Sequence, residues 1–358
     1  MTTDELRESL LMDSQNGYTR ITPEQREDME RYCLRYRTFL DACKTEREAT
    51  AWTVREAEKR GYKPFAPGMT VNPGDKIYYN NRDKSIALAV IGRKPLAEGV
   101  NICAAHVDSP RLDLKPNPLY EDSEIAYFKT HYYGGIKKYQ WPTIALALHG
   151  VVYRKDGSVV TVTIGEEDSD PVLMVSDLLP HLAGDQMQKT LAKGIAGEQL
   201  NVILGSEPLE GEGSDLVKLN IMRLLNEKYG LIEADFLSAE LTVVPAGRCR
   251  EVGLDRSLLG AYGHDDRVCA YAELDALLTV ENPERLPFVF WQTRKRSAPW
   301  AFPACRATSS SISWAACATR RVQSWRTVWQ ILSACPQMFP MPTTPISPRP
   351  ATSGTTAS

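Results

Sequence analysis

The sequence lacks the features that mark secreted and membrane proteins. No Cys-x-x-Cys pair occurs among its eight cysteines, and no apolar run approaches the roughly 18 residues that cross a bilayer. The N-terminal residues are acidic and contain no apolar core typical of a signal peptide. The net charge is only -3, so no general excess of basic residues favours nucleic acid or anionic membrane. We therefore expect a soluble, cytoplasmic protein whose partner is a small molecule.

Two further absences divide the chain. No acidic residue follows Glu284 and no histidine follows His264. From Phe288 onward, eight basic residues and five of the seven Trp occur with a single Gly. Three interpretations are open. The segment is a basic, Trp-containing arm that binds nucleic acid, a disordered extension, or a stretch that was never selected as protein, because it has too many Trp for a linker and too little periodicity for a core.

The body before this segment contains clear local signals for helices and strands. Thr22 and Gln25 form a capping box around Pro23, which predicts a helix over 23–42. Thr45 and Glu48 repeat the spacing and predict a second helix that stops at Gly61. The apolar runs 76–79 and 86–92 flank a polar turn and predict a hairpin. The sequence also predicts a buried strand at 100–105, a mostly β insertion at 113–250 and a helix at 270–278.

His106 follows the predicted buried strand, and Asp108 comes two residues later. Alternation along a strand puts these two side chains on the same side, where Asp108 can support the imidazole of His106. A histidine whose second nitrogen is held by a carboxylate is a good zinc ligand. The alternative is a hydrogen-bonded histidine of the core or surface, and His-x-Asp alone does not decide between them.

Asp265 lies in a second group of metal-binding side chains, between His264 and Asp266 and just before the predicted helix at 270–278. A carboxylate in such a loop can bridge two metal ions about 3.5 to 4 Å apart. The alternative is a helix cap, because Asp is favoured at helix N-termini.

Taken together, four motifs resemble the aspartyl aminopeptidase family in their order and spacing, over about residues 5–287. The motifs are Ala104-Ala105-His106-Val107-Asp108-Ser109-Pro110-Arg111-Leu112, Tyr132-Tyr133-Gly134-Gly135 followed by Trp141, Leu179-Pro180-His181-Leu182-Ala183, and Gly263-His264-Asp265-Asp266-Arg267. The resemblance implies a two-zinc exopeptidase that removes N-terminal residues from peptides, acidic ones in many members. Co²⁺ or Mn²⁺ are alternatives to Zn²⁺.

The resemblance also implies roles for four residues. His106 would ligate one zinc, Asp108 would be a catalytic-site residue that orients His106, and Asp265 would bridge both metals. His181 matches a substrate-binding histidine near the pocket of a neighbouring subunit, and its alternative is a plain helix-face histidine.

The implied architecture is α/β. It comprises a zinc-peptidase-like α/β/α sandwich catalytic domain, in two parts at 1–112 and 251–287, and an inserted, mostly β dimerisation domain at 113–250. Family members assemble from dimers into dodecamers, so a homo-oligomer is expected. The catalytic domain would be incomplete at its C-terminus, with 288–358 as a frameshifted tail that is disordered or misfolded.

The family pattern after Asp265 contains a Glu-Glu-Ile-Gly segment, with a general base and a metal ligand, then another acidic ligand and a final histidine. This chain has none of them. In the neighbouring reading frame, however, Phe290 with Trp291 forces Leu and Trp291 with Gln292 forces Ala. The overlaps that follow, through Ala298, permit Asp-Lys-Glu-Glu-Ile-Gly. We therefore hypothesise a frameshift near Phe288, with a sequencing error, a real mutation and a pseudogene as the alternative origins.

The written chain should then be inactive, because His106 and Asp265 do not supply the three protein ligands usual for a catalytic zinc. The competing hypothesis is a non-catalytic, oligomerising interaction protein with a basic, nucleic-acid-binding tail. Zinc content and salt-sensitive binding by the tail discriminate the two.

Overall fold

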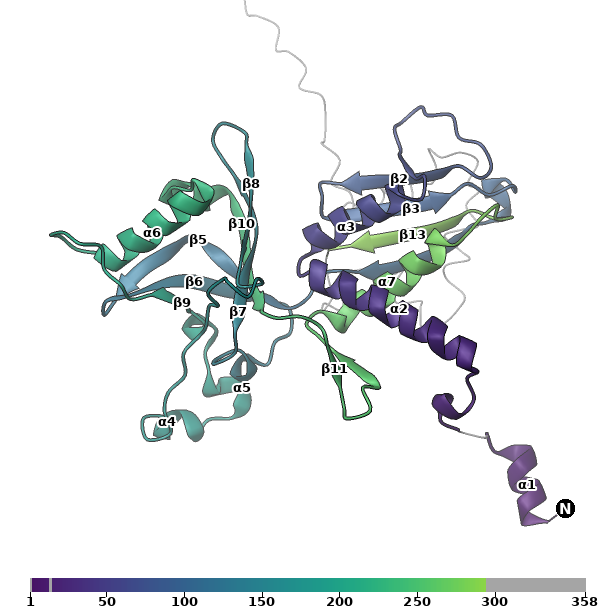
Figure 1. Cartoon of the computed structure of the whole chain (residues 1–358), viewed down its shortest axis with the longest axis horizontal. Coiled ribbons are helices and arrows are strands. Elements are labelled where there is room, and N and C mark those ends of the chain that lie inside the picture. The colour runs from purple at the N-terminus through teal and green to yellow at the C-terminus, as the bar shows by residue number, and fades with distance from the viewer. Residues whose placement is uncertain (1, 13–14, 294–358) are drawn as a thin grey trace, which may run out of the picture. The chain divides into compact units, whose positions relative to one another are not determined.

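The computed structural model describes residues 2–12 and 15–293, apart from the side chain of Asp266 (Figure 1). These residues form two compact units. Unit 1 contains Met1–Thr53 and Val107–Tyr271, and unit 2 contains Val54–His106 and the described residues from Ala272 onward. The boundary falls inside two helices, α3 (Glu46–Glu58) and α7 (His264–Leu278).

The centre of unit 1 is a six-stranded antiparallel sheet, in the order β8-β7-β10-β5-β6-β9. Helix α6 lies against this sheet (Figure 1), and its Ile221, Met222 and Leu225 join the apolar core of the unit. The sheet agrees with the mostly β prediction for 113–250, whereas no sequence pattern above predicts α6. The strands and helix are β5 (Arg111–Asp122), β6 (Ile125–Tyr133), β7 (Leu146–Tyr153), β8 (Val159–Ile164), β9 (Val202–Gly205), β10 (Ala239–Pro245) and α6 (Leu216–Tyr229).

Short elements complete unit 1. Strands β11 and β12 form a separate antiparallel pair. The remaining helices are α1 (Thr3–Leu10), α2 (Pro23–Ala42), α4 (Gly184–Met187), α5 (Leu191–Gly194) and the 3-10 turns Gly17–Thr19, Lys138–Gln140, Gly197–Gln199 and Glu233–Ser238, and the strand pair is β11 (Arg250–Val252) with β12 (Leu258–Gly260).

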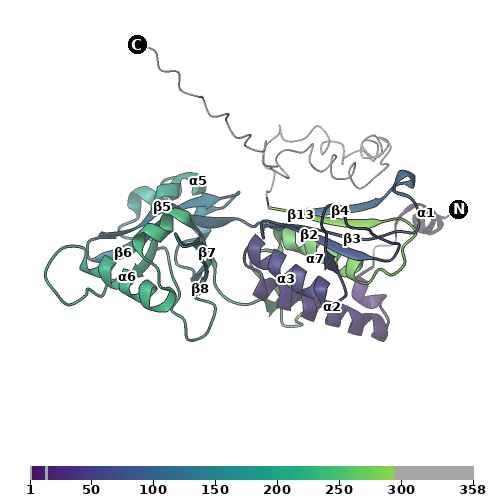
Figure 2. The same cartoon turned by 90° about the horizontal axis from the view of Figure 1, so that it is seen from above.

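Unit 2 is built on a five-stranded sheet in the order β1-β2-β3-β13-β4. Strand β13 pairs antiparallel with β3 and parallel with β4. The ends of α3 and α7 that belong to this unit lie on one face of the sheet (Figure 2), where Tyr78 donates a hydrogen bond to Glu58 at 2.7 Å. The elements are β1 (Lys63–Pro64), β2 (Lys76–Asn81), β3 (Ser85–Val90), the 3-10 turn Leu96–Glu98, β4 (Asn101–His106) and β13 (Pro287–Gln292).

The mixed α/β architecture with separate sheets confirms the predicted fold class. The capping-box predictions are also confirmed. The Thr22 hydroxyl accepts from the amide of Gln25, whose side chain accepts from the amide of Thr22, and α2 begins at Pro23. Glu48 accepts from the amide of Thr45 at 2.8 Å at the start of α3.

Two local predictions were wrong in part. The strand at 100–105 exists as β4, but its first four residues are exposed, because β4 is the edge strand of the sheet formed by the described residues. The Asp265 motif was placed in a loop before a helix, whereas α7 already begins at His264. Asp265 therefore lies in the first turn of α7.

Two more findings bear on the sequence predictions. Residues Phe288 to Gln292, the first of the predicted tail, belong to β13, and Phe288 and Phe290 are buried in the core of unit 2. The rest of the predicted tail, 294–358, lies outside the described residues. No helix in the described ranges has the length and apolar character needed to cross a membrane.

Candidate functional site

Asp108 lies in the extended segment between β4 and β5 and is fully buried. Its Oδ2 accepts a hydrogen bond of 2.6 Å from the hydroxyl of Tyr133, at the end of β6. Burial, and then the hydrogen bond and negative charge of Asp108, raise the pKa of the Tyr133 phenol well above its ordinary value. The phenol therefore keeps its proton at physiological pH and donates this hydrogen bond to Asp108.

A second contact joins the segment after Asp108 to the start of α7. The Ser109 hydroxyl donates to the backbone carbonyl of Asp265 at 3.0 Å, and Ser109 is 2% exposed. The hydroxyl of Tyr262 donates to the carbonyl of Pro110, also at 3.0 Å. Two motifs that are about 155 residues apart along the chain are thereby held together through side chain to backbone hydrogen bonds.

The turn before α7 is shaped by a buried arginine. Arg267 is fully buried, donates to the carbonyl of Lys44 at 2.8 Å, and lies over the ring of Tyr262. Gly263 has φ +86°, and a Cβ at that position would lie 1.8 Å from Arg267 Nη1. Only glycine fits there, because the guanidinium occupies the space and the backbone is left-handed.

His264 is part of an aromatic cluster and not of a metal-binding group in the described residues. Its Nδ1 lies 2.9 Å from the hydroxyl of Tyr36, and burial raises the pKa of Tyr36 well above its ordinary value. The Tyr36 ring packs at a tilt against the His264 ring and against Tyr271, which in turn packs at a tilt against Phe39. The cluster fixes the first turn of α7 and so the backbone of Asp265.

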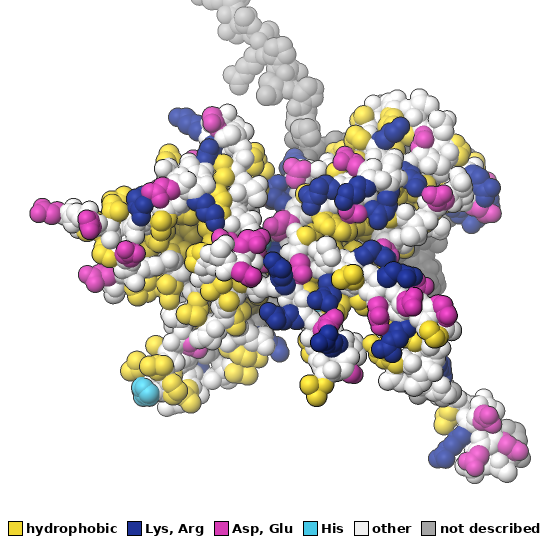
Figure 3. Space-filling model, viewed as in Figure 1, with side chains coloured by type: hydrophobic (Ala, Val, Ile, Leu, Met, Phe, Trp, Pro, Cys, Tyr) yellow, Lys and Arg dark blue, Asp and Glu magenta, His cyan; other side chains and the backbone are white. Residues whose placement is uncertain are grey.

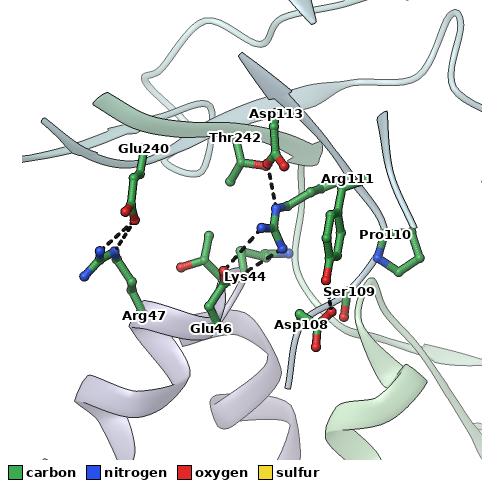
Figure 4. Close-up of polar contacts among 12 residues, drawn as sticks. Lys44, Glu46, Arg47, Asp108, Ser109, Pro110, Arg111, Asp113, Glu240 and Thr242 are labelled. Carbon is green, nitrogen blue, oxygen red and sulfur yellow. Dashed lines mark hydrogen bonds and ion pairs between the residues drawn. The ribbon is translucent and has the colours of Figure 1, made fainter. Parts of the chain in front are cut away.

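Arg111 forms ion pairs with two carboxylates, those of Glu46 and Asp113 (Figure 4). Its guanidinium donates to both carboxylate oxygens of Glu46 at 3.2 Å and to Asp113 at 2.7 Å. It also lies 4.4 Å from the centroid of the Tyr133 ring. Although burial lowers the pKa of Arg111, the charges of Glu46 and Asp113 outweigh burial and raise it. A planar guanidinium held by two carboxylates is a rigid support for the ring that it covers.

His149 forms a second buried ionic group, on β7. Its Nδ1 lies 2.8 Å from Glu48 and its Nε2 3.0 Å from Glu166. Lys44 Nζ lies 3.9 Å from the same Glu166. Burial lowers the pKa of His149, but the hydrogen bonds and charges of Glu166 and Glu48 outweigh it and raise the pKa to about 9. His149 is thus an imidazolium that joins the start of α3 to the six-stranded sheet.

The structure places the four predicted site residues in different surroundings. Asp108 and Asp265 belong to unit 1 and are linked through Ser109. His106 is half-buried at the end of β4 in unit 2, where it pairs with Gln292 of β13. His181 is exposed in the turn before α4. The strand alternation used for His106 and Asp108 does not apply, because β4 ends at His106.

The imidazole of His106 and the carboxylate of Asp265 are donor types that zinc accepts. Within residues 2–12 and 15–293, no three or more His, Cys, Asp and Glu side chains converge to hold a metal ion. The imidazole and the carboxylate are therefore suitable kinds of zinc ligand, but the described part of the chain does not supply the three protein ligands usual for a catalytic zinc.

Sequence reasoning assigned no role to Ser109, Tyr133 or Tyr262, although the first two stand in the quoted motifs. Hydroxyl groups next to charged motif residues are a usable signal, because buried carboxylates and carbonyls need donors. The particular partners were not predictable, because they depend on the close approach of segments far apart in the chain.

Unit 1 also contains an apolar cavity of about 470 Å³, between α6 and the sheet. Phe128, Leu148 and Leu225 are among its lining residues, with Lys228 also contributing to the wall. Hydrophobic side chains gather over α6 and the neighbouring strands in Figure 3. None of the four predicted site residues lines this cavity.

Comparison with known families identifies the chain. The family described as Aminopeptidase I zinc metalloprotease (M18) matches residues 39–288. The chain belongs to this family, and the resemblance deduced from the four motifs is confirmed. The match ends at Phe288, where the composition of the sequence changes.

Curated relatives and solved structures support the same family assignment. The "Probable M18 family aminopeptidase 1" of Clostridium acetobutylicum is 49% identical over 281 residues, which is 77% of this chain and 60% of the relative. The crystal structure of an M18 aminopeptidase from Thermotoga maritima is similar with a TM-score of 0.77 and 39% identity, covering 90% of this chain and 70% of that chain. The chain thus spans about 60% of the length of the curated relatives that it matches.

A more distant structure, titled as the S. cerevisiae mApe1 dodecamer, is 18% identical with a TM-score of 0.60, covering 84% of this chain and 70% of that chain. This likeness shows the shared fold alone.

Proposed function

We propose that the gene from which this chain derives specifies a metallo-aminopeptidase that removes N-terminal residues, acidic ones in particular, from peptides. The observation that carries the proposal is the family match over residues 39–288, which includes both motifs with predicted metal ligands. The hydrogen bond from Ser109 to the Asp265 carbonyl supports it, because the two motifs lie together as a shared site requires.

In this proposal His106 and Asp265 would hold zinc, and Asp108 would orient the His106 ring. Co²⁺ and Mn²⁺ are alternatives. Zinc in such a site supplies Lewis-acid polarisation of the scissile carbonyl and lowers the pKa of a water ligand. A carboxylate beside a metal-bound histidine holds the imidazole in one tautomer and one orientation, and this is the role proposed for Asp108.

The assembly is part of the proposal. Residues 1–112 and 251–287 would form the catalytic domain and 113–250 an inserted dimerisation domain. The segment around His181 carries exposed apolar side chains at Leu179 (60%), Leu182 (69%) and Met187 (72%). Clustered apolar exposure favours burial against a neighbouring subunit. His181 would then meet the peptide substrate of that neighbour.

We also propose that the written chain is inactive, because a frameshift near Phe288 removes the general base and the remaining ligands. Two observations support this. The family match ends at Phe288, and no acidic residue follows Glu284 in the given sequence. Loss of the general base alone would reduce the rate by a factor of about 10² to 10⁴.

The test begins with resequencing the source DNA across the codons for Leu286 to Ala301. The chain is then expressed as written and in the restored frame, which continues through Glu-Glu-Ile-Gly. The restored chain should bind about two zinc ions per subunit and release N-terminal Asp or Glu from a peptide, and a chelator should abolish the activity. The chain as written should show no such activity.

A restored chain that binds no zinc and cleaves no N-terminal residue would contradict the aminopeptidase assignment. An active chain as written would contradict the frameshift. In the restored frame, His106→Ala should lose zinc. The matched control is His131→Ala, at an exposed histidine, which should keep zinc.

A further inference from the structure

We propose that the cavity between α6 and the six-stranded sheet of unit 1 is a binding site for a small, uncharged, mainly apolar molecule, such as an alcohol with an alkyl chain of medium length. All the residues that carry the inference belong to unit 1, and no metal ion takes part in it. The inference goes beyond the proposed peptidase function and does not depend on it.

The first step is the size and chemistry of the cavity. Its volume of about 470 Å³ lies within the range of about 300 to 1,000 Å³ that is typical of small-molecule sites. An apolar cavity of about 150 Å³ is already large enough to bind benzene. Four strands and α6 contribute apolar side chains to the wall, among them Phe128, Leu148, Ile164, Leu204 and Ile221. The wall therefore favours a hydrocarbon group.

The second step is that hydrogen bonds at both ends of α6 hold the helix in place. Near its start, the amide of Lys218 donates to Glu121 of β5 at 2.9 Å. At its end, the hydroxyl of Tyr229 donates to the carbonyl of Thr163 on β8 at 2.6 Å. Because both ends are anchored, the helix is not free to move onto the sheet and close the cavity. A ligand then binds without the cost of rearranging the helix.

The third step concerns charge. The polar side chains of the wall, Glu227, Lys228 and Tyr229, all come from the end of α6. Lys228 forms an ion pair with Asp170 at 3.1 Å, and Glu227 forms one with Arg223 at 2.7 Å. A charged ligand would lose its water on entering and would have to compete for these paired groups, which is unfavourable. The wall therefore selects an uncharged ligand.

The fourth step is access to the cavity. Leu224 of α6 lines the cavity and is 47% exposed, so the cavity reaches the solvent beside this residue. Apolar side chains gather on the surface over α6 and the neighbouring strands (Figure 3). A ligand can therefore enter beside the helix without unfolding of unit 1.

The experiment uses the chain as written and follows hydrogen exchange of its peptides by mass spectrometry, which reports where a ligand acts. The probes are octanol, octanoate and octylamine, which share one alkyl chain and differ in charge. At roughly ten times its dissociation constant, octanol should slow exchange in α6 about 10-fold, while β2 and β3 of unit 2 should not change. Octanoate and octylamine should bind about 10- to 100-fold more weakly.

Variants test the location of the site. Leu224→Trp should block the entrance and weaken octanol binding about 10-fold or more. The matched control is Leu219→Trp, because Leu219 lies on the same helix and is 51% exposed but does not line the cavity. Its affinity for octanol should match that of the parent. Leu204→Phe fills the cavity from β9 and should also weaken binding, which keeps the test decisive if Leu224→Trp disturbs the helix.

Four results would overturn the inference. Equal protection by octanol in Leu224→Trp, Leu204→Phe and Leu219→Trp would mean that octanol binds apolar surface in general. Octanoate or octylamine bound as tightly as octanol would mean that the wall recognises charge. Unchanged exchange of α6 at the solubility limit of octanol would mean that the cavity takes no such ligand. Protection of α6 that rises with protein concentration without octanol would mean that a second copy of the chain covers the cavity.

Discussion

At the scale of single residues, the structure stabilises buried charge with opposite charge drawn from distant parts of the chain. His149 is 2% exposed and lies between Glu48 of α3 and Glu166 beyond β8. Arg111 lies between Glu46 and Asp113 in the same way. Breaking such a group by removing one partner costs about 3 to 5 kcal/mol, because a charge is left buried and uncompensated.

The His149 group predicts a dependence of stability on pH. The pKa of His149 is about 9 in the folded protein and about 6.5 in an unfolded chain, so the imidazolium is favoured by folding. This contribution, about 3 kcal/mol, is fully present below pH 6.5 and is lost as the pH rises through 9. Burial raises the pKa of Glu48, but its bonds to His149 and Thr45 outweigh burial and lower it, so the Glu48 contribution is lost at acidic pH.

Histidine-selective NMR of the chain as written should therefore show one imidazole that titrates near pH 9, and His149→Gln should remove that resonance. The exposed His131→Gln is the control and should leave it in place. Titration of His149 near pH 6.5 would mean that the two carboxylates do not stabilise its imidazolium form.

At the scale of helices and strands, the sequence predicted the elements that local chemistry determines. Local contacts, between residues no more than four positions apart, determine these elements. They include the capping boxes at Thr22 and Thr45 and the polar turn at 80–83. In the hairpin, Arg82 and Asp83 have φ of 56° and 57°, values that a tight turn between antiparallel strands requires.

Elements whose surroundings come from elsewhere in the chain were predicted less well. The exposure of β4 depends on which strands lie beside it, and the start of α7 at His264 depends on Tyr36 and Arg267. Likewise, the sequence indicated the motifs of His106 and Asp265 separately. The Ser109 hydrogen bond that joins the two motifs could be found only from the folded structure.

Strand β7 provides a prediction at this scale. Gly150 has φ +141°, and a Cβ there would lie 1.9 Å from the carbonyl oxygen of Glu240 on β10. Gly150→Ala should therefore separate β7 from β10, at a cost of about 3 kcal/mol or more. Hydrogen exchange of peptides from both strands, followed by mass spectrometry, should become faster.

The matched control is Gly184→Ala at the start of α4, where no atom lies within 4 Å of the added Cβ. Its exchange should stay as in the parent. If Gly150→Ala exchanges as slowly as Gly184→Ala, the close approach of β7 and β10 is wrong.

At the scale of the whole molecule, the family match ends within strand β13 of unit 2. This strand brings Phe288, Val289 and Phe290 into the sheet, and only the first of these three lies within the matched residues. Strand β4 then remains at the edge of the described sheet, with Ile102 47% exposed. An edge strand with apolar side chains is a template for pairing with another chain.

We therefore expect the written chain to associate irregularly, whereas the restored chain should form one homo-oligomer of defined mass. Size-exclusion chromatography with light scattering should show a broad range of masses for the written chain, together with binding of a dye specific for exposed apolar surface. A chain that stops after Thr293 separates the two causes. It should associate in the same way if the β4 edge is responsible, and it should become monodisperse if residues 294–358 drive association. A written chain that runs as a single species without binding the dye would contradict this expectation and show that the β4 edge does not drive association.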